Sequence, residues 1–354
     1  MDRITITRPD DWHLHLRDGA AMVSALQHSA RVFGGALIMP NLKPPVTTAG
    51  EALRYYARII EPLHEPPFKA LFEPIMTLYL TDNTMPKDVE EAAKSGLVKA
   101  FKLYPANATT NSADGVSDID KIEGVLAAIE ELGLVLCVHG ELLCDDAGEV
   151  DIFDREKRFL EDVLLEIVDS YPKLRIVLEH ATTAEAVQFV ESFPNIAATM
   201  TAHHLLENRN AIFRGGVNPH HYCLPIMKRE CAREALLLAA TSGSPKFFLG
   251  TDSAPHAKGT KECGCGCAGC FTAHAAIELY AEAFDSLGAL NRLEGFASHF
   301  GADFYGLPRN TDRITLVRKP WTVPASYPFG ESEVIPFRAG KTVAWRVKGL
   351  EYPS

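Results

Sequence analysis

Two histidines separated by one residue, His13 and His15, are the first residues along the chain whose spacing suggests chemistry. In a β-strand, alternate side chains point to the same face, so both imidazoles would enter one cavity. Imidazole nitrogen is a preferred zinc ligand, and the pair could supply two ligands to one ion. The alternative is a pair of hydrogen-bonded histidines at the end of a strand.

Other polar residues stand where apolar runs end. His139, His180 and Asp252 each lie at or just beyond the end of such a run. This place is unfavourable for an unpaired charge and typical of a catalytic group in a parallel barrel. Four imidazoles and one carboxylate could hold one zinc ion, whereas two ions would need a bridging ligand.

Lys102 is the candidate for that bridge, because it lies inside the apolar segment 100–105. A buried ammonium is costly, and burial lowers the pKa of a lysine and exposes a nucleophilic amine. Such an amine can react with carbon dioxide to give a carbamate, whose two oxygens can span two metals. The alternative is a lysine that extends to solvent or pairs with an acid.

These residues need a scaffold that gathers the ends of many strands. Short apolar runs alternate with segments of helical period, such as 49–63, 86–94, 118–132, 156–170 and 184–192. The pattern predicts an α/β fold, a (β/α)8 TIM barrel whose active site lies where the strands end. The predicted strands are 3–14, 35–39, 73–80, 98–103, 134–138, 175–178, 196–200 and 246–249.

The rest of the chain predicts a closing helix over 273–287 and a tail that packs on the barrel from about Leu307. We therefore interpret residues 1–354 as a single barrel domain with a short C-terminal extension. The sequence shows no internal repeat.

Composition excludes several classes of protein. Of the 354 residues, 47% are hydrophobic, and the net charge of −11 argues against nucleic-acid or anionic-membrane partners. The N-terminus lacks a secretory signal, and no apolar run approaches the about 18 residues of a membrane span. Eight cysteines, four of them within 263–270, do not form a secreted disulfide framework. We expect a soluble, cytoplasmic protein.

The candidate ligands resemble, in order and context, those of the amidohydrolase superfamily. Five further segments are similar to dihydroorotases of the shorter bacterial and fungal type, and the resemblance runs from about residue 11 to residue 308. These segments are 38–45, 102–111, 215–220, 222–225 and 250–256.

The resemblance implies a centre with two zinc ions. His13, His15 and Asp252 would bind the more buried ion, and His139 and His180 the more exposed one. Lys102, carboxylated to N6-carboxylysine, would bridge both ions together with a hydroxide.

The implied activity is the reversible cyclisation of N-carbamoyl-L-aspartate to (S)-dihydroorotate and water, a step of de novo pyrimidine (UMP) biosynthesis. Two metal ions can share a hydroxide and polarise the carbonyl that it attacks. Asp252 would act as the general acid and base, moving a proton between that hydroxide and the ring nitrogen. Its alternative role is that of a ligand only.

The resemblance assigns Arg17, Asn41 and His256 to the substrate carboxylate that does not react. Arg17 lies two residues beyond His15, which predicts the same strand face, and its planar guanidinium suits a carboxylate. The alternative partner of Arg17 is the adjacent Asp18.

Two other contributions to substrate binding follow from the resemblance. Backbone groups near Leu224 and Ala268 would pair with the ring amides. The polar segment 105–115 resembles a mobile loop in which Thr109 and Thr110 reach the substrate.

The cysteines of 263–270 have spacings that suit a sulfur metal site poorly, since only Cys267 and Cys270 are separated by two residues. We interpret this segment as a Gly-rich loop on the substrate side. Four histidines near the predicted rim receive no role from their spacing: His203, His204, His220 and His221.

Two other functions compete with this interpretation. A hydantoinase or dihydropyrimidinase would share the metal chemistry but would have no carboxylate to bind. A catalytically inactive scaffold would have lost ligands, whereas all six positions are occupied here. We also expect a homodimer and a small-molecule substrate.

Overall fold

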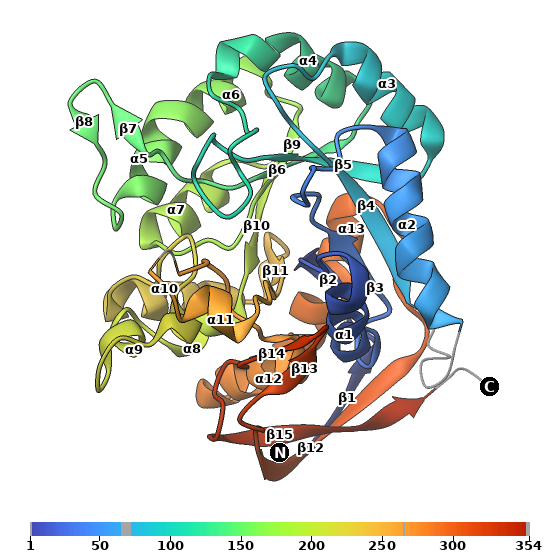
Figure 1. Ribbon diagram of the computed structural model, residues 1–354, viewed down its shortest axis with the longest axis vertical. Coiled ribbons are helices and arrows are strands. Elements are labelled where there is room, and N and C mark those ends of the chain that lie inside the picture. The colour runs from blue at the N-terminus through green and yellow to red at the C-terminus, as the bar shows by residue number, and fades with distance from the viewer. Residues whose placement is uncertain (1, 65–71, 265, 352–354) are drawn as a thin grey trace.

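The computed structural model describes residues 2–64, 72–264 and 266–351. Eight strands, each parallel to its neighbours, form the central sheet, with helices outside it (Figure 1). Their order is β2 (Asp11–Leu14), β3 (Gly35–Ile38), β4 (Glu73–Tyr79), β5 (Val98–Leu103), β6 (Val135–Val138), β9 (Arg175–Leu178), β10 (Ile196–Met200) and β11 (Phe247–Leu249). The predicted TIM barrel is confirmed.

The barrel closes where β11 meets β2. The backbone N–H of Asp252 donates to the carbonyl oxygen of His13 at 2.9 Å. The Asp11 carboxylate accepts hydrogen bonds from the Thr251 backbone N–H at 2.8 Å and from its hydroxyl at 2.6 Å. The closure therefore fixes Asp252 beside His13.

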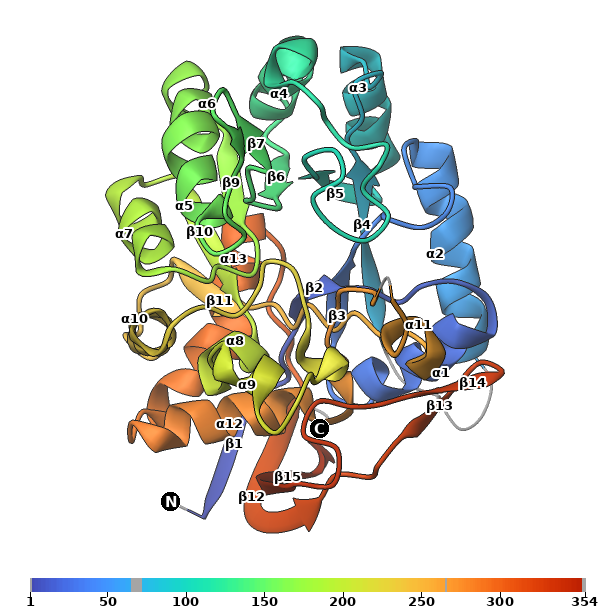
Figure 2. The ribbon, with the colours of Figure 1, turned by 60° about the vertical axis from the view of Figure 1, so that its left-hand side comes forward.

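Helices surround the strands on the outside (Figure 2). The predicted helix 49–63 is confirmed as α2, which begins at Thr48 with a capping box formed with Glu51. The α-helices are α1 (Gly19–Ala30), α2 (Ala49–Leu63), α3 (Pro86–Ser95), α4 (Glu123–Glu131), α5 (Arg155–Phe159), α6 (Leu165–Ser170), α7 (Ala184–Ser192), α8 (Ala202–Leu206), α9 (Asn210–Phe213), α10 (Glu230–Ala240), α11 (Lys258–Lys261), α12 (Ala276–Ser286) and α13 (Phe300–Tyr305).

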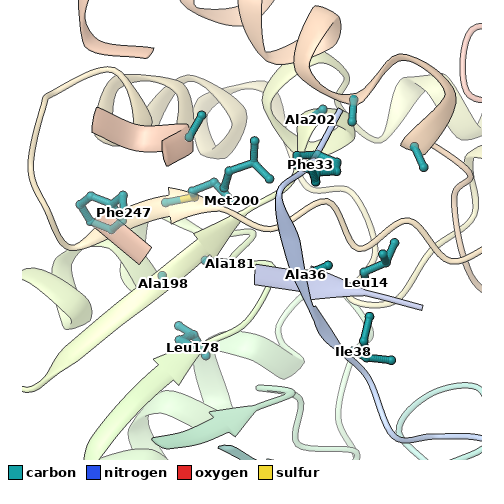
Figure 3. Close-up of a cluster of buried hydrophobic side chains, with 14 of the residues drawn as sticks. Leu14, Phe33, Ala36, Ile38, Leu178, Ala181, Ala198, Met200, Ala202 and Phe247 are labelled. Carbon is teal, nitrogen blue, oxygen red and sulfur yellow. The ribbon is translucent and has the colours of Figure 1, made fainter. Parts of the chain in front are cut away.

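Alternate strand residues form two separate apolar layers. Side chains such as Ile38, Ala198 and Phe247 point outward, into the core between strands and helices (Figure 3). Their neighbours fill the barrel, where the Tyr305 hydroxyl of α13 lies 3.1 Å from the Cys137 sulfur. Polar residues lie two positions beyond inner apolar ones: Lys102 after Ala100, His139 after Cys137, Glu179 after Val177 and Thr199 after Ala197. The period of a strand thus places a polar layer directly on an apolar one.

The predicted single strand 3–14 is wrong, because the segment forms two strands separated by Pro9. Only β2 belongs to the barrel. Strand β1 (Arg3–Thr7) pairs antiparallel with β12 (Arg313–Thr322), which pairs with β15 (Thr342–Glu351). The short strands β13 (Tyr327–Phe329) and β14 (Ser332–Val334) form a hairpin, and β7 (Cys144–Asp145) pairs with β8 (Gly148–Glu149).

The tail sheet contacts the barrel helices through Trp345. This indole on β15 is fully buried, and its Nε1 donates to the Asp285 carboxylate of α12 at 3.3 Å. We propose on this basis that the tail and the barrel fold as one domain.

Trp345→Ala tests that proposal. Removing a large buried aromatic side chain should lower the free energy of unfolding by about 3–5 kcal/mol. If the tail and barrel are one unit, chemical denaturation followed by circular dichroism should show one transition, shifted to lower denaturant. The exposed Leu53→Ala should change little. A separate early transition with an unshifted main one would contradict the proposal.

Candidate metal centre

Three predicted ligands meet at the closure of the barrel. The Asp252 Oδ1 atom lies 3.1 Å from His15 Nε2 and 3.5 Å from His13 Nε2. The two imidazole Nε2 atoms lie 3.3 Å apart. All three side chains are buried, and their ligand atoms lie within 4.8 Å of one another, so one ion could contact all three.

The other two histidines form an adjoining pair. His139 Nδ1 lies 3.2 Å from His180 Nε2, and the ring centroids of His13 and His180 are 5.0 Å apart. His180 follows β9 with a φ of 44°, a left-handed conformation uncommon for a residue with a side chain. Burial lowers the pKa of both His13 and His180, which favours the neutral rings that metals bind.

Lys102 lies on β5 within the same polar layer. Its side chain is fully buried, and Nζ has no hydrogen-bond partner among the residues that the structure describes. Burial lowers its pKa, although Glu179, Cys137 and Asp252 favour the charged form. An ammonium left unpaired in this position is costly, whereas a neutral amine or a metal-bound carbamate would relieve the cost.

Hydrogen-bond acceptors behind the histidines determine which ring nitrogen faces the centre. His13 Nδ1 lies 2.7 Å from a Glu179 oxygen, and His139 Nε2 lies 2.8 Å from a Glu141 oxygen. His15 Nδ1 lies 2.8 Å from Asn41 Oδ1. In each case the second nitrogen is left for an ion, an arrangement typical of metal-binding histidines. The residues therefore fit metal ions.

Sequence reasoning missed Glu141 and Glu179. Both are fully buried, and Glu179 also accepts from the Thr199 hydroxyl at 2.5 Å. The available signal was their position: Glu141 lies two residues after His139, and Glu179 immediately precedes His180. A carboxylate in such a place must have a buried partner.

Arg17 reaches the site from a loop and not from the strand on which it was predicted. Strand β2 ends at Leu14, so Arg17 lies in a loop, with a φ of 68°. Its Nε donates to the Pro255 carbonyl oxygen at 2.9 Å, and its Nη2 lies 2.9 Å from His256 Nε2. Adjacent Asp18 instead pairs with Arg58 at 2.9 Å. Arg17 nevertheless lines the cavity.

The predicted loop 105–115 lies against the centre. Asn41 Nδ2 donates to the Thr110 carbonyl oxygen at 3.1 Å, and the Thr110 hydroxyl donates to the Ala268 carbonyl oxygen at 3.3 Å. The cavity has a volume of about 20 Å³, roughly the space of one water molecule. It is lined by His13, His15, Arg17, Asn41, Tyr104, Thr109, Thr110, His139, His180, Leu224, Asp252, Ala254, Ala268 and Gly269.

The Gly-rich segment 263–270 lies beside this cavity, although its Cys265 falls outside the described residues. Lys261 holds the segment from within, since its buried ammonium donates to the carbonyl oxygens of Tyr222, Cys267 and Gly269. The backbone of Ala268 and Gly269 thereby forms part of the cavity wall.

Comparison with known proteins agrees with this geometry. A model described as the amidohydrolase family matches residues 7–324. A dihydroorotase from Aromatoleum aromaticum is 60% identical over 349 residues, covering 98% of this chain and all of the relative. The chain belongs to the dihydroorotases of the amidohydrolase family. Members of this family are generally metal-dependent, in agreement with the candidate ligand group of His13, His15 and Asp252.

Solved structures of dihydroorotases and hydantoinases have the same fold as this chain. The crystal structure of the dihydroorotase from Saccharomyces cerevisiae in complex with 5-fluoroorotic acid has a TM-score of 0.90 at 32% identity, with both chains fully covered. An L-hydantoinase (dihydropyrimidinase) from Arthrobacter aurescens has a TM-score of 0.78 at 17% identity, over 98% of this chain and 84% of that one. The hydantoinases therefore share the fold but are distant from this dihydroorotase sequence.

Glu179→Gln tests whether the acceptor behind His13 serves the metal centre. Removing the charge should weaken the hydrogen bond between residue 179 and His13 Nδ1. The affinity of the metal centre for zinc should then fall about 10–100-fold, as for other carboxylates that support metal-binding histidines. Competition with a coloured chelator measures this affinity. Glu185→Gln, an exposed control, should bind zinc as the wild type does. Unchanged affinity in Glu179→Gln would show that this hydrogen bond is not needed for metal binding.

Proposed function

We propose that this chain catalyses the reversible cyclisation of N-carbamoyl-L-aspartate to (S)-dihydroorotate and water, with two zinc ions per chain. The observation that carries the proposal is the buried Lys102 amine, which has no hydrogen-bond partner among the described residues and lies in the same layer as two adjoining groups of ligand atoms. The nearly full-length similarity to dihydroorotases supports the choice of reaction.

His13, His15 and Asp252 would hold one ion, and His139 and His180 the other. Lys102, as N6-carboxylysine, would contribute an oxygen to each. When bound, two such ions activate a water molecule and polarise the carbonyl that it attacks.

Asp252 is the proposed general acid and base. In cyclisation the ureido nitrogen forms a bond to the carbon of the side-chain carboxyl group, and water is lost. Asp252 takes the proton from that nitrogen and passes it to the departing oxygen, which gains its second proton from solvent and leaves as water; in hydrolysis Asp252 returns a proton to the ring nitrogen. Burial raises the pKa of the Asp252 carboxyl, whereas the neighbouring His13 and Lys102 lower it.

Arg17, Asn41 and His256 are proposed to bind the second carboxylate of the substrate. Arg17 and His256 are in contact, and the Arg17 guanidinium retains donors for a carboxylate. Backbone groups of Leu224 and Ala268 would pair with the ring amides. The structure of the yeast relative contains 5-fluoroorotic acid, a ring that also carries a carboxylate.

The loop with Thr109 and Thr110 is proposed to act as a lid. A cavity of about 20 Å³ cannot admit a substrate of this size, so the loop must move away for entry. Closure over the substrate would then exclude water, which suits a reaction that releases water.

No helix in the described part of the chain combines the length and apolar character needed to cross a bilayer. We further propose a cytoplasmic location, a homodimer, and a role in pyrimidine biosynthesis. A catalytically inactive scaffold on this barrel would bind no metal. Measuring the metal content of the protein therefore separates that alternative from the proposed enzyme.

Arg17→Ala tests the substrate. Losing a charge-assisted pair of about 1.5–3 kcal/mol should lower kcat/KM for dihydroorotate roughly 10–150-fold, mainly through KM. Slow turnover of dihydrouracil, which has no carboxylate, should be unaffected. The exposed Arg54→Ala is the control and should retain wild-type kinetics. Preference of the wild type for dihydrouracil would contradict the proposal and favour a dihydropyrimidinase.

A further inference from the structure

Tyr104 brings a buried hydroxyl to the cavity of the candidate metal centre. The residue directly follows β5, two positions beyond Lys102, and lines the cavity. Its side chain is 1% exposed, and its hydroxyl has no hydrogen-bond partner among the described residues. A buried phenol usually has such a partner, so this hydroxyl points to a partner that is not part of the described chain.

The hydroxyl has a cost that phenylalanine would avoid. A polar group buried without a partner destabilises a protein, whereas phenylalanine would fill the same space with no polar group. Asn41 and Thr110, which line the same cavity, both have hydrogen-bond partners. The Tyr104 hydroxyl therefore lowers the stability of the folded chain, a cost typical of residues that bind a ligand.

Neighbouring residues hold the Tyr104 ring in place. Its face stacks on the ring of Tyr79, with 5.0 Å between the ring centroids and 29° between the planes. The Tyr104 carbonyl oxygen accepts a hydrogen bond from the Val116 backbone N–H at 2.9 Å. The Tyr79 hydroxyl in turn donates to the Asn111 carbonyl oxygen at 3.3 Å. Packing therefore fixes where the Tyr104 hydroxyl lies.

Charged neighbours place this hydroxyl near two residues of the proposed function. Burial raises the pKa of the Tyr104 hydroxyl, the Asp252 carboxylate raises it further, and the Arg17 guanidinium lowers it. A hydroxyl on which both charges act lies near both side chains. A phenol carries its proton at neutral pH, so it can donate a hydrogen bond to an oxygen there.

Lys102 is poorly placed to be the missing partner. Its amine lies over the face of the Tyr104 ring, 5.1 Å from the ring centroid. The hydroxyl projects from the edge of the ring and in its plane, so it is not directed at an atom above the face. A substrate held by Arg17 would instead bring carbonyl and carboxylate oxygens, all of which accept hydrogen bonds.

We propose that the Tyr104 hydroxyl donates a hydrogen bond to an oxygen of the bound substrate, which makes Tyr104 a further substrate-binding residue. This inference rests on the proposed function, because that function supplies the substrate oxygens. Tyr104 also contributes to specificity, since a ligand with an apolar group at this place would leave the hydroxyl unpaired.

Tyr104→Phe tests this role, because it removes the hydroxyl and keeps the ring. Orotate, a non-reacting ring with the same two carbonyl groups and carboxylate as dihydroorotate, should bind the zinc-loaded variant roughly 3–10-fold more weakly in calorimetric titration, the loss expected for one neutral hydrogen bond. The kcat/KM for dihydroorotate should fall by a similar factor.

Two further readouts separate substrate binding from a structural role. The zinc content of Tyr104→Phe should equal that of the wild type, and its unfolding temperature should be equal or higher, because a hydroxyl without a partner is removed. Tyr171→Phe is the matched control, since it removes a hydroxyl that donates to the Glu123 carbonyl oxygen and does not line the cavity. It should bind orotate as the wild type does.

Unchanged orotate affinity and unchanged kcat/KM in Tyr104→Phe would overturn the proposal. A loss of zinc or a lower unfolding temperature would also overturn it, because the hydroxyl would then serve the metal centre or the fold. Failure of the proposed function has a different signature, namely wild-type protein that neither binds orotate nor turns over dihydroorotate, and it would overturn both.

Discussion

The burial of one amine constrains the rest of this molecule. Lys102 lies inside a closed barrel with no hydrogen-bond partner among the residues that the structure describes, surrounded by imidazoles and by Asp252. The group is fully buried, and none of the side chains that the structure describes accepts a hydrogen bond from it, so the ammonium form is strongly disfavoured. The position is tolerable if the nitrogen is neutral or carries an anionic group that cations neutralise. The histidines and Asp252 supply the place for such cations.

The barrel makes this arrangement rigid. Beneath the polar layer, apolar side chains fill the interior of the barrel, and α13 covers its lower end. The ring of Tyr305 on α13 stacks on that of Trp12, with 4.6 Å between the ring centroids. Behind the histidines, Glu179, Glu141 and Asn41 hold the rings at their outer nitrogens. The ligands are therefore positioned before any ion arrives, which reduces the entropy lost on binding.

Sequence alone predicted the barrel because apolar runs alternate with segments of helical period and polar residues follow most of those runs, and both are local patterns. The prediction is wrong at residues 3–14, where two apolar stretches on either side of the polar residues 7–11 indicated one strand, although they belong to two different sheets. It placed Arg17 on a strand that ends three residues earlier, since a positive φ in a non-glycine residue leaves no sequence signal. The carboxylates behind the histidines depend on contacts between distant segments, which no local pattern encodes.

The central claim is that Lys102 carries the bridge between two metal ions. The direct measurement is zinc per chain and dihydroorotate turnover, compared between the wild type and Lys102→Ala. The account predicts about two catalytic zinc ions and turnover in the wild type, with both reduced in the variant, because two ions in adjoining sites repel each other without a bridging anion. Full zinc content and full turnover in Lys102→Ala would contradict it.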